Sequence, residues 1–233
     1  MRKILIIGLG KFGRELIESL SKTEIEVIAV DQNINLVNEV KDIVSYAAQL
    51  DSTDIASLKE IGADTADIAI VTIGENFESC ILTVAALKEI GIKTIIVRAK
   101  NDREARILSI VGATKVIEVE KEMARRLART LFAPTVKDYI ALAEGYSIIQ
   151  WEVSDKFIGK SLANCRFRAD YGVNVIGIRR NIPQDIGAEK SDSTFELVPD
   201  ASYIFEKGDI LLIVGKEENL MRLTGIDLTQ IKD

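Results

Sequence analysis

The 233-residue chain contains no histidine. Histidine is the commonest general base and the commonest metal ligand, so its absence argues against most catalytic and metal-dependent classes of protein. Cysteine is scarce too: Cys80 and Cys165 both lie in apolar-patterned segments, which indicates neither a disulfide framework nor a metal knuckle. Only three prolines and no low-complexity tract interrupt a sequence that is 47% hydrophobic. We therefore expect a globular protein that folds throughout, in a reducing cytoplasm.

Long hydrophobic runs and basic clusters are also lacking. The longest apolar runs, at residues 4–9 and 68–73, are far shorter than the roughly 20 residues that cross a bilayer. Lys and Arg are scattered in a chain of net charge −6, so no basic stripe is available for a nucleic acid backbone or an anionic lipid surface. The sequence begins Met-Arg-Lys and runs directly into a strand, without the pattern of a signal peptide. We expect no nucleic-acid partner and no direct membrane insertion.

From residue 1 to about 120, short β-branched runs alternate with longer stretches of helical spacing. The runs are apolar without polar alternation, as is typical of strands buried on both faces. Such strands form a parallel sheet that is covered by helices on each side. The pattern therefore predicts a Rossmann-type, doubly wound α/β domain, with strands at 4–7, 27–30, 44–47, 68–73, 94–97 and 115–117.

The alternation of strand and helix patterns ends at about residue 120. Residues 121–132 carry Met123, Leu127 and Leu131 on one stripe, and Pro134 separates them from a second helical pattern at 136–143. This crossover helix pair needs a cover for its stripe, which either the first domain or a partner subunit can supply. A small α+β lobe follows, with strands at 147–153, 173–178 and 210–214, short helices at 162–169 and 217–223, and a polar loop at 181–193. The predicted domains are therefore 1–120, 121–143 and 144–233.

A glycine-rich motif follows the first strand and opens a helix. Its residues are Gly8, Leu9, Gly10, Lys11, Phe12 and Gly13. The first glycine permits a tight turn, the second lets a pyrophosphate approach the backbone, and the third allows the helix to pack against the strand. The helix N-terminus then faces the anion. The motif predicts a nucleotide site, and a tight turn without a ligand is the alternative.

Asp31 ends the second strand, about 20 residues after the motif, where a carboxylate accepts hydrogen bonds from ribose hydroxyls. Gln32 and Asn33 follow it in place of a basic residue, so the 2′-phosphate of NADP would meet an uncompensated negative charge. We therefore expect ATP or ADP, or NAD or NADH, with Gln32 beside the ligand.

The remaining candidate contacts lie after the third, fourth and fifth strands: Asp51, Ser52 and Thr53, then Ile73, Gly74 and Asn76, and finally Arg98. Ser52 or Thr53 is equally well interpreted as a helix N-cap, and Asn76 can be a cap as well as a contact. Lys11 and Arg98 are cations that can meet phosphates, while a solvated lysine is the alternative for Lys11.

Taken together, these residues make nearly the whole chain resemble the RCK (Ktr/Trk) family, which comprises cytoplasmic regulators of potassium uptake and potassium channels. The resemblance rests on residues 7–13, 29–31, 51–53, 71–76, 97–101, 111–117 and 120–124, and in the second half on 168–172, Pro199, 208–211 and 214–215.

The resemblance implies a nucleotide lobe, a crossover helix pair that dimerises subunits, and a C-terminal lobe that dimerises separately. It further implies a ring, commonly octameric, beneath a separate membrane pore protein, with ATP and ADP or NADH and NAD favouring different ring shapes. Lys11 would contact terminal phosphates where many relatives have Arg, so a point charge replaces a bidentate fork. Asp31 would hold the ribose, and Glu120 would lie near a nucleotide-linked divalent cation. In several relatives the C-terminal lobe binds cyclic di-AMP, and Arg168, Asn174 and Pro199 stand in a similar arrangement here, although Arg168 can equally pair with a surface carboxylate.

Two rival functions remain open. An NAD-dependent oxidoreductase uses the same turn and the same acid. Its chemistry needs a proton relay, however, and the one Tyr-x-x-x-Lys match, Tyr203 to Lys207, runs into a strand rather than along a helix. The other rival is a nucleotide or second-messenger sensor unrelated to potassium transport. We expect a regulatory, non-enzymatic subunit.

Overall fold

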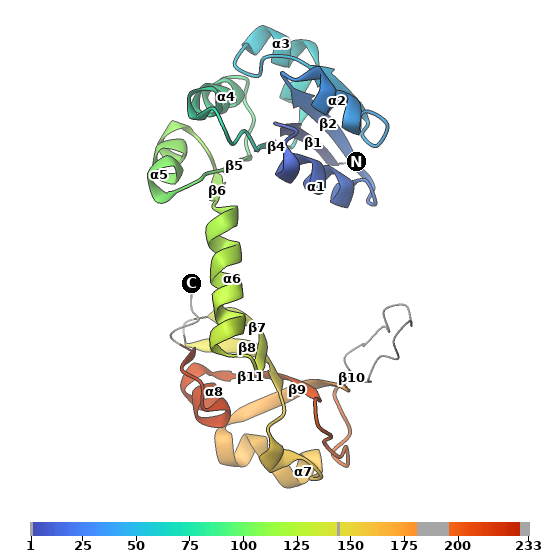
Figure 1. Ribbon diagram of the computed structural model, residues 1–233, viewed down its shortest axis with the longest axis vertical. Coiled ribbons are helices and arrows are strands. Elements are labelled where there is room, and N and C mark those ends of the chain that lie inside the picture. Colours follow the sequence, from blue (N-terminus) through green and yellow to red (C-terminus); the bar gives the residue numbers. More distant parts are fainter. Residues whose placement is uncertain (1, 144, 181–195, 229–233) are drawn as a thin grey trace. The chain divides into compact units, whose positions relative to one another are not determined.

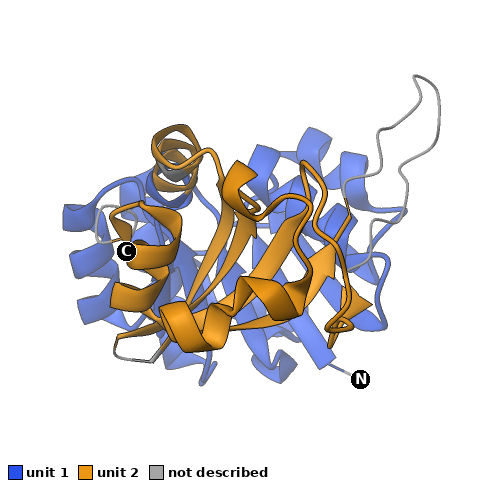
Figure 2. Ribbon diagram, turned by 90° about the horizontal axis from the view of Figure 1, so that it is seen from below, with its two compact units in different colours: residues 1–122 blue, residues 123–233 orange. Residues whose placement is uncertain are grey.

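The computed structural model describes residues 2–143, 145–180 and 196–228. It divides the chain into two compact units, Met1–Glu122 and Met123–Asp233 (Figure 2). None of the helices in these described ranges is long and apolar enough to cross a membrane.

The first unit is built on a six-stranded sheet of order β3-β2-β1-β4-β5-β6, and all its neighbouring strands pair in parallel. The strands are β1 (Arg2–Ile7), β2 (Ile25–Asp31), β3 (Tyr46–Gln49), β4 (Ile68–Val71), β5 (Ile95–Arg98) and β6 (Lys115–Ile117) (Figure 1). The strand order reverses between β1 and β4, and ligands bind at such a point in open α/β sheets. The predicted doubly wound fold is confirmed, although β3 begins at Tyr46 rather than at residue 44.

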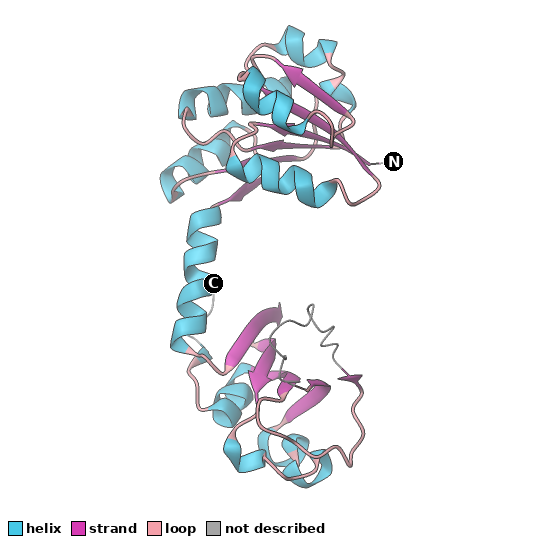
Figure 3. Cartoon of the chain, turned by 45° about the vertical axis from the view of Figure 1, so that its right-hand side comes forward, coloured by secondary structure: helices cyan, strands magenta, loops and turns pink. Residues whose placement is uncertain are grey.

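Five helices cover the two faces of this sheet: α1 (Lys11–Leu20), α2 (Ile34–Val40), α3 (Ile55–Glu60), α4 (Phe77–Glu89) and α5 (Asp102–Val111) (Figure 3). Successive residues of β1 enter different cores. Leu5 packs together with Leu87 of α4 in one cluster, while Ile6 and Ile17 of α1 belong to the other. Burial on both faces explains why the strands are continuously apolar.

The second unit contains a five-stranded antiparallel sheet of order β10-β9-β11-β8-β7. Its strands are β7 (Val136–Ala143), β8 (Tyr146–Glu152), β9 (Val173–Arg179), β10 (Glu196–Leu197) and β11 (Ile210–Lys216). The helices here are α6 (Val119–Phe132), which begins in the first unit, α7 (Leu162–Cys165), a π-helix at Phe167–Tyr171, and α8 (Glu217–Thr224). The core is aromatic, and Phe157 contacts Trp151 and Phe167 within it. The small α+β lobe is thus confirmed, whereas the predicted loop at 181–193 lies outside the described residues.

The predicted crossover pair of helices is wrong, because the second member of the pair is strand β7. It pairs antiparallel with β8, and register shifts occur between Val136 and Asp138 and between Ala141 and Ala143. Each irregularity interrupts the two-residue alternation of a strand, so the apolar residues acquire a spacing that imitates a helix. The chain passes between units at Glu122 and Met123, and residues 123–143 therefore belong to the second unit.

Helix α6 carries an exposed apolar stripe, as its sequence predicts. Met123, Leu127 and Leu131 have exposed fractions of 60%, 60% and 75%. Isolated exposed apolar residues are ordinary, but three on one helical stripe form a surface suited to another apolar surface.

Candidate nucleotide-binding site

The turn between β1 and α1 requires glycine at two positions. Gly8 has φ +95°, and its amide donates a 2.8 Å hydrogen bond to the carbonyl of Val30. A Cβ on Gly8 would lie 2.9 Å from the amide nitrogen of Ile73, and one on Gly13 would lie 2.1 Å from the carbonyl oxygen of Gly8. Protein packing alone therefore demands these two glycines, whether or not a ligand is bound.

Gly10 differs from the other two. It precedes α1 with extended backbone at φ −62° and ψ −175°, and a Cβ placed on it would meet no heavy atom within 4 Å. Neither packing nor dihedral angle calls for glycine here. The absence of a side chain instead leaves open space before the first turn of α1, whose amides have no partner within the helix. Such a space suits a phosphate.

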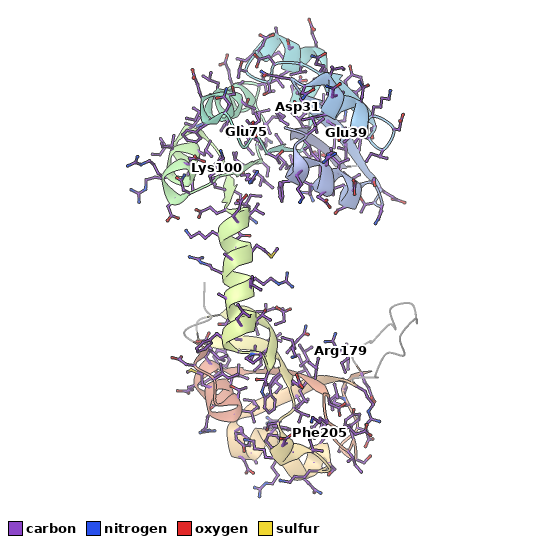
Figure 4. All side chains as sticks on the ribbon, in the orientation of Figure 1. Asp31, Glu39, Glu75, Lys100, Arg179 and Phe205 are labelled. Atoms are coloured by element: carbon purple, nitrogen blue, oxygen red, sulfur yellow. The ribbon has the colours of Figure 1, made fainter. Side chains whose placement is uncertain are left out.

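Asp31, labelled in Figure 4, is the last residue of β2, and its carboxylate is tied to this turn. The amide of Leu9 donates a 2.7 Å hydrogen bond to Oδ2 of Asp31, and the amide of Asn33 donates a 2.8 Å bond to Oδ1. A carboxylate has about four acceptor sites, so two remain for ribose hydroxyls. Asp31 can thus fix the turn and hold a ribose at the same time.

The loop after β3 is arranged differently from the expectation. Asp51 accepts hydrogen bonds from the amide and the hydroxyl of Thr53, at 2.9 and 2.7 Å, and these bonds hold the pKa of Asp51 below its usual value. Ser52 is buried, with its hydroxyl 2.7 Å from that of Thr83 in α4, so it points into the core. Asp54 caps α3, and the interpretation of Ser52 or Thr53 as the cap is wrong.

At the ends of β4 and β5, polar groups gather at the carboxyl edge of the sheet. Asn76 caps α4 by accepting a 3.0 Å hydrogen bond from the amide of Ser79, as its alternative interpretation predicts. Arg98 ends β5, and Nη1 of its guanidinium would lie 3.0 Å from a Cβ on Gly74. Its Nη2 donates to Oε1 of Glu120 in the first turn of α6. Arg98 thus joins the loop after β4 to the start of α6.

The predicted cation position at Glu120 lacks companion ligands. The backbone amide of Glu120 and the Arg98 guanidinium hold the pKa of this carboxyl low. No group of three or more acidic or cysteine side chains that could hold a metal ion occurs in the part of the chain that the structure describes. A position of Glu120 beside a cation that is also held by a nucleotide stays a prediction.

In the second unit, a pocket of about 320 Å³ brings two of the three predicted second-ligand residues together. Its lining residues are Leu162, Arg166, Phe167, Arg168, Ala169, Val173, Asn174 and Val175. Arg168 and Asn174 thus share one pocket, and Pro199 is not among its lining residues.

Two cysteines and one tyrosine have pKa values raised by burial. Burial raises the pKa of the Cys80 thiol to about 11 and also raises the pKa of Cys165, so both thiols are protonated at neutral pH. Tyr203 donates a 3.0 Å hydrogen bond to Asp209 and accepts one of 3.1 Å from Nε of Arg180, while burial raises its pKa. Tyr203 thus belongs to a hydrogen-bonded network within the second unit.

Sequence reasoning did not identify the side chains that support the site from within. The hydroxyl of Thr72, directly after β4, donates to the carbonyl of Gly8 and so stabilises the glycine turn. Asn33 caps α2 by accepting a 3.0 Å hydrogen bond from the amide of Asn35. The only available signal was their position directly after buried strands.

Comparisons with known proteins identify the family of the chain. The family models of the TrkA-N domain and the TrkA-C domain match residues 4–119 and 151–226. Ktr system potassium uptake protein C of Bacillus subtilis (strain 168) is 36% identical over 95% of both chains. Ktr system potassium uptake protein A of Vibrio alginolyticus is 30% identical over 94% of both chains.

Solved structures show the same fold. The GsuK RCK domain superimposes with a TM-score of 0.65 at 18% identity, over 96% of this chain and 48% of that one. The GsuK channel bound to NAD gives a TM-score of 0.66 at 17% identity, over 100% of this chain and 40% of that one. Because the two family models together match most of the chain and two Ktr relatives are at least 30% identical over nearly its full length, the chain belongs to the RCK family of Ktr and Trk potassium uptake proteins.

Proposed function

We propose that the chain is a nucleotide-binding regulatory subunit of a potassium uptake system. The observation that carries the proposal is the open start of α1 at Gly10 beside the carboxylate of Asp31, which is bonded to the amide of Leu9. The two Ktr relatives, which are potassium uptake proteins, connect this site to potassium transport. The subunit acts at the inner face of the membrane through a separate pore subunit.

The ligand is an adenine nucleotide, either ATP and ADP or NAD and NADH. Asp31 receives the ribose, the first turn of α1 receives two phosphates, and Lys11 and Arg98 meet the group attached beyond the second phosphate. The GsuK channel, whose fold this chain shares, carries NAD. A nucleotide shifts the assembly between shapes only as far as it binds one shape more tightly than the other.

The role is binding rather than catalysis. The chain has no histidine to act as a general base, and burial holds both thiols protonated. An NAD-dependent oxidoreductase would consume NADH in the presence of an oxidised substrate. Steady NADH turnover by the purified chain would contradict the regulatory role.

The function is tested in two stages. The purified chain is first denatured, the released small molecules are identified by mass spectrometry, and ATP, ADP, NAD and NADH are then titrated calorimetrically. The chain is next expressed with and without a Ktr membrane pore subunit in cells deficient in potassium uptake. Nucleotide binding together with pore-dependent uptake supports the proposal. Nucleotide binding without co-purification or any effect on uptake would favour a sensor unrelated to potassium.

Lys11→Ala is expected to weaken ATP binding about fivefold while changing ADP binding little, because an exposed cation contributes only a modest, screened interaction to the terminal phosphate. Calorimetric titration measures both affinities. Lys22→Ala removes the same charge beyond the other end of α1 and serves as the matched control. An equal loss for ATP and ADP would contradict the terminal-phosphate role of Lys11.

The subunit forms homodimers that build a larger ring, and the stripe on α6 is the proposed dimer contact. Leu127→Arg places a charge in the centre of this exposed apolar stripe and is expected to lower the mass of the assembly. Light scattering after gel filtration measures the mass. Glu122→Arg introduces the same side chain at an exposed, non-stripe position of α6 as the control. An unchanged mass for Leu127→Arg would exclude the stripe as the contact.

The pocket in the second unit is the proposed site for cyclic di-AMP, and the shared position of Arg168 and Asn174 supports this ligand. Arg168→Ala removes one cation that would face a phosphate and is expected to weaken binding about tenfold. Calorimetry with cyclic di-AMP is the measurement, and Lys207→Ala removes a charge outside the pocket as the control. An unchanged affinity of Arg168→Ala for cyclic di-AMP would mean that this ligand does not bind in the pocket.

A further inference from the structure

Arg166 lies at a strained point of the backbone in the second unit, between helix α7 and the π-helix at Phe167–Tyr171. Its φ of +48° and ψ of +37° place it in the left-handed region, which glycine adopts freely and other residues adopt only at an energetic cost. Among the described residues, Val198 is the one other non-glycine residue with a positive φ. An arginine thus occupies a position whose backbone favours glycine.

The core of the second unit imposes the bend at Arg166. The side chains before and after it, those of Cys165 and Phe167, are both buried in that core. The carbonyl of Arg166 accepts a 2.9 Å hydrogen bond from the amide of Asp170, whose own carbonyl accepts one of 3.3 Å from Nη2 of Arg222 in α8. These contacts hold the left-handed conformation in place, and the side chain of Arg166 is left 66% exposed.

The exposed side chain of Arg166 lines the same pocket as Arg168. Among the described residues of the lining, Asn174 is the one other polar residue, and the rest are apolar. None of these lining residues is acidic. The pocket therefore offers two guanidiniums beside apolar side chains, a combination that suits a phosphate attached to a nucleoside.

Neither packing nor the ion pair with Asp170 accounts for an arginine at position 166. Glycine would supply the same bend without strain. The ion pair measures 3.6 Å, which is longer than a hydrogen bond, and its two side chains are 66% and 49% exposed. Such a pair contributes little to stability. Backbone strain that the fold does not need is typical of residues that bind a ligand.

We propose that Arg166 is a second phosphate-binding residue of this pocket beside Arg168, and that its left-handed conformation serves to direct the guanidinium toward the ligand. The inference rests on the proposed cyclic di-AMP site. A phosphodiester has two unesterified oxygens, so two guanidiniums can each donate to one of them. The weak ion pair with Asp170 gives way to this charge-assisted hydrogen bond when the ligand binds.

Arg166→Gly separates a ligand role from a structural role, because it should change stability and affinity in opposite directions. Glycine adopts the left-handed conformation without strain, so we expect the melting temperature of the full chain to rise by about 2 °C. Loss of the guanidinium should weaken cyclic di-AMP binding about fivefold, since an exposed cation contributes a modest interaction. Calorimetry at low and at high salt measures the affinity, and the difference from the wild type should shrink at high salt.

Three further variants serve as controls. Val198→Gly relieves the same kind of strain, at φ +57°, and gives the gain in melting temperature that strain relief alone produces. Lys207→Ala removes a positive charge outside the pocket lining and should leave the affinity for cyclic di-AMP unchanged. Arg166→Lys keeps the charge at the pocket but not the paired donors, so it should lose less affinity than Arg166→Gly.

Several results would overturn the inference. An unchanged affinity of Arg166→Gly for cyclic di-AMP would show that Arg166 does not bind the phosphate, and the proposed ligand of the pocket would stand. A lower melting temperature together with weaker binding would assign Arg166 to the fold instead. An equal loss of affinity in Lys207→Ala would indicate a general charge effect. If the wild type does not bind cyclic di-AMP, the inference fails together with that proposed ligand, while the nucleotide site of the first unit is decided by its own titrations.

Discussion

Replacing Asp31 with alanine is expected to raise the Kd for ATP, ADP and NAD by at least about 100-fold, because each hydrogen bond to a charged acceptor contributes about 1.5 to 3 kcal/mol and a ribose makes two of them. The loss should be similar for all three ligands, since they share the adenosine half. Calorimetric titration of the purified variant is the measurement. Asp31→Asn retains one acceptor oxygen and should give an intermediate affinity.

The control must account for the structural role of Asp31. Its carboxylate also accepts hydrogen bonds from the amides of Leu9 and Asn33, so alanine will lower stability as well as affinity. Asp67 offers a matched case, because its Oδ2 accepts a 2.8 Å bond from the amide of Lys3 at the start of β1, the opposite edge of the sheet. Asp67→Ala should lower the melting temperature without changing nucleotide affinity. If Asp31→Ala bound nucleotides as tightly as Asp67→Ala, Asp31 would not hold the ribose.

The sequence predicts the first unit well because its central strands are buried on both faces. In β1, Leu5 and Ile6 face different cores, and both cores are apolar. A strand of this kind is continuously apolar whichever helices cover it, so it can be recognised as a strand from the sequence alone. The glycine motif can be recognised for a related reason: Gly8 has φ +95°, and a Cβ on Gly13 would collide with the carbonyl oxygen of Gly8 in the same turn.

The second unit is harder to predict because its strand β7 is irregular. The register shifts at Val136 to Asp138 and at Ala141 to Ala143 arise from pairing with β8, and pairing is a property of two segments rather than one. Local periodicity therefore favours a helix at a place where the hydrogen-bonded partner imposes a strand.

The support of the site depends on contacts that no local pattern encodes. The hydrogen bond from Leu9 to Asp31 spans 22 residues, and the one from Thr72 to Gly8 spans 64. Ser52 shows the converse case: its place after β3 suggested a ligand contact, but its hydroxyl lies 2.7 Å from that of Thr83 of α4 in the core. Spacing identifies which strand ends gather at the sheet edge, and packing decides which side chains face the ligand.

Gly13→Ala is expected to lose both stability and nucleotide binding, whereas Gly10→Ala is expected to lose nucleotide binding alone. A Cβ on Gly13 would lie 2.1 Å from the carbonyl oxygen of Gly8, so the backbone of the turn must shift. We expect the free energy of unfolding of Gly13→Ala to fall by about 3 kcal/mol, as overpacking of a rigid site requires. Denaturant titration measures this change, and nucleotide binding should be lost together with the native turn.

Gly10→Ala should instead remain folded, with a change in the free energy of unfolding below about 1 kcal/mol, because its Cβ meets no protein atom within 4 Å and its φ of −62° suits any residue. The added methyl group occupies the space through which a pyrophosphate approaches the first turn of α1, so nucleotide affinity should fall about 50-fold. Comparing melting temperature and Kd for the two variants separates the glycine that the fold needs from the glycine that the ligand needs. Undiminished nucleotide affinity in a stably folded Gly10→Ala would mean that the phosphates do not lie at the start of α1, whatever the behaviour of Gly13→Ala.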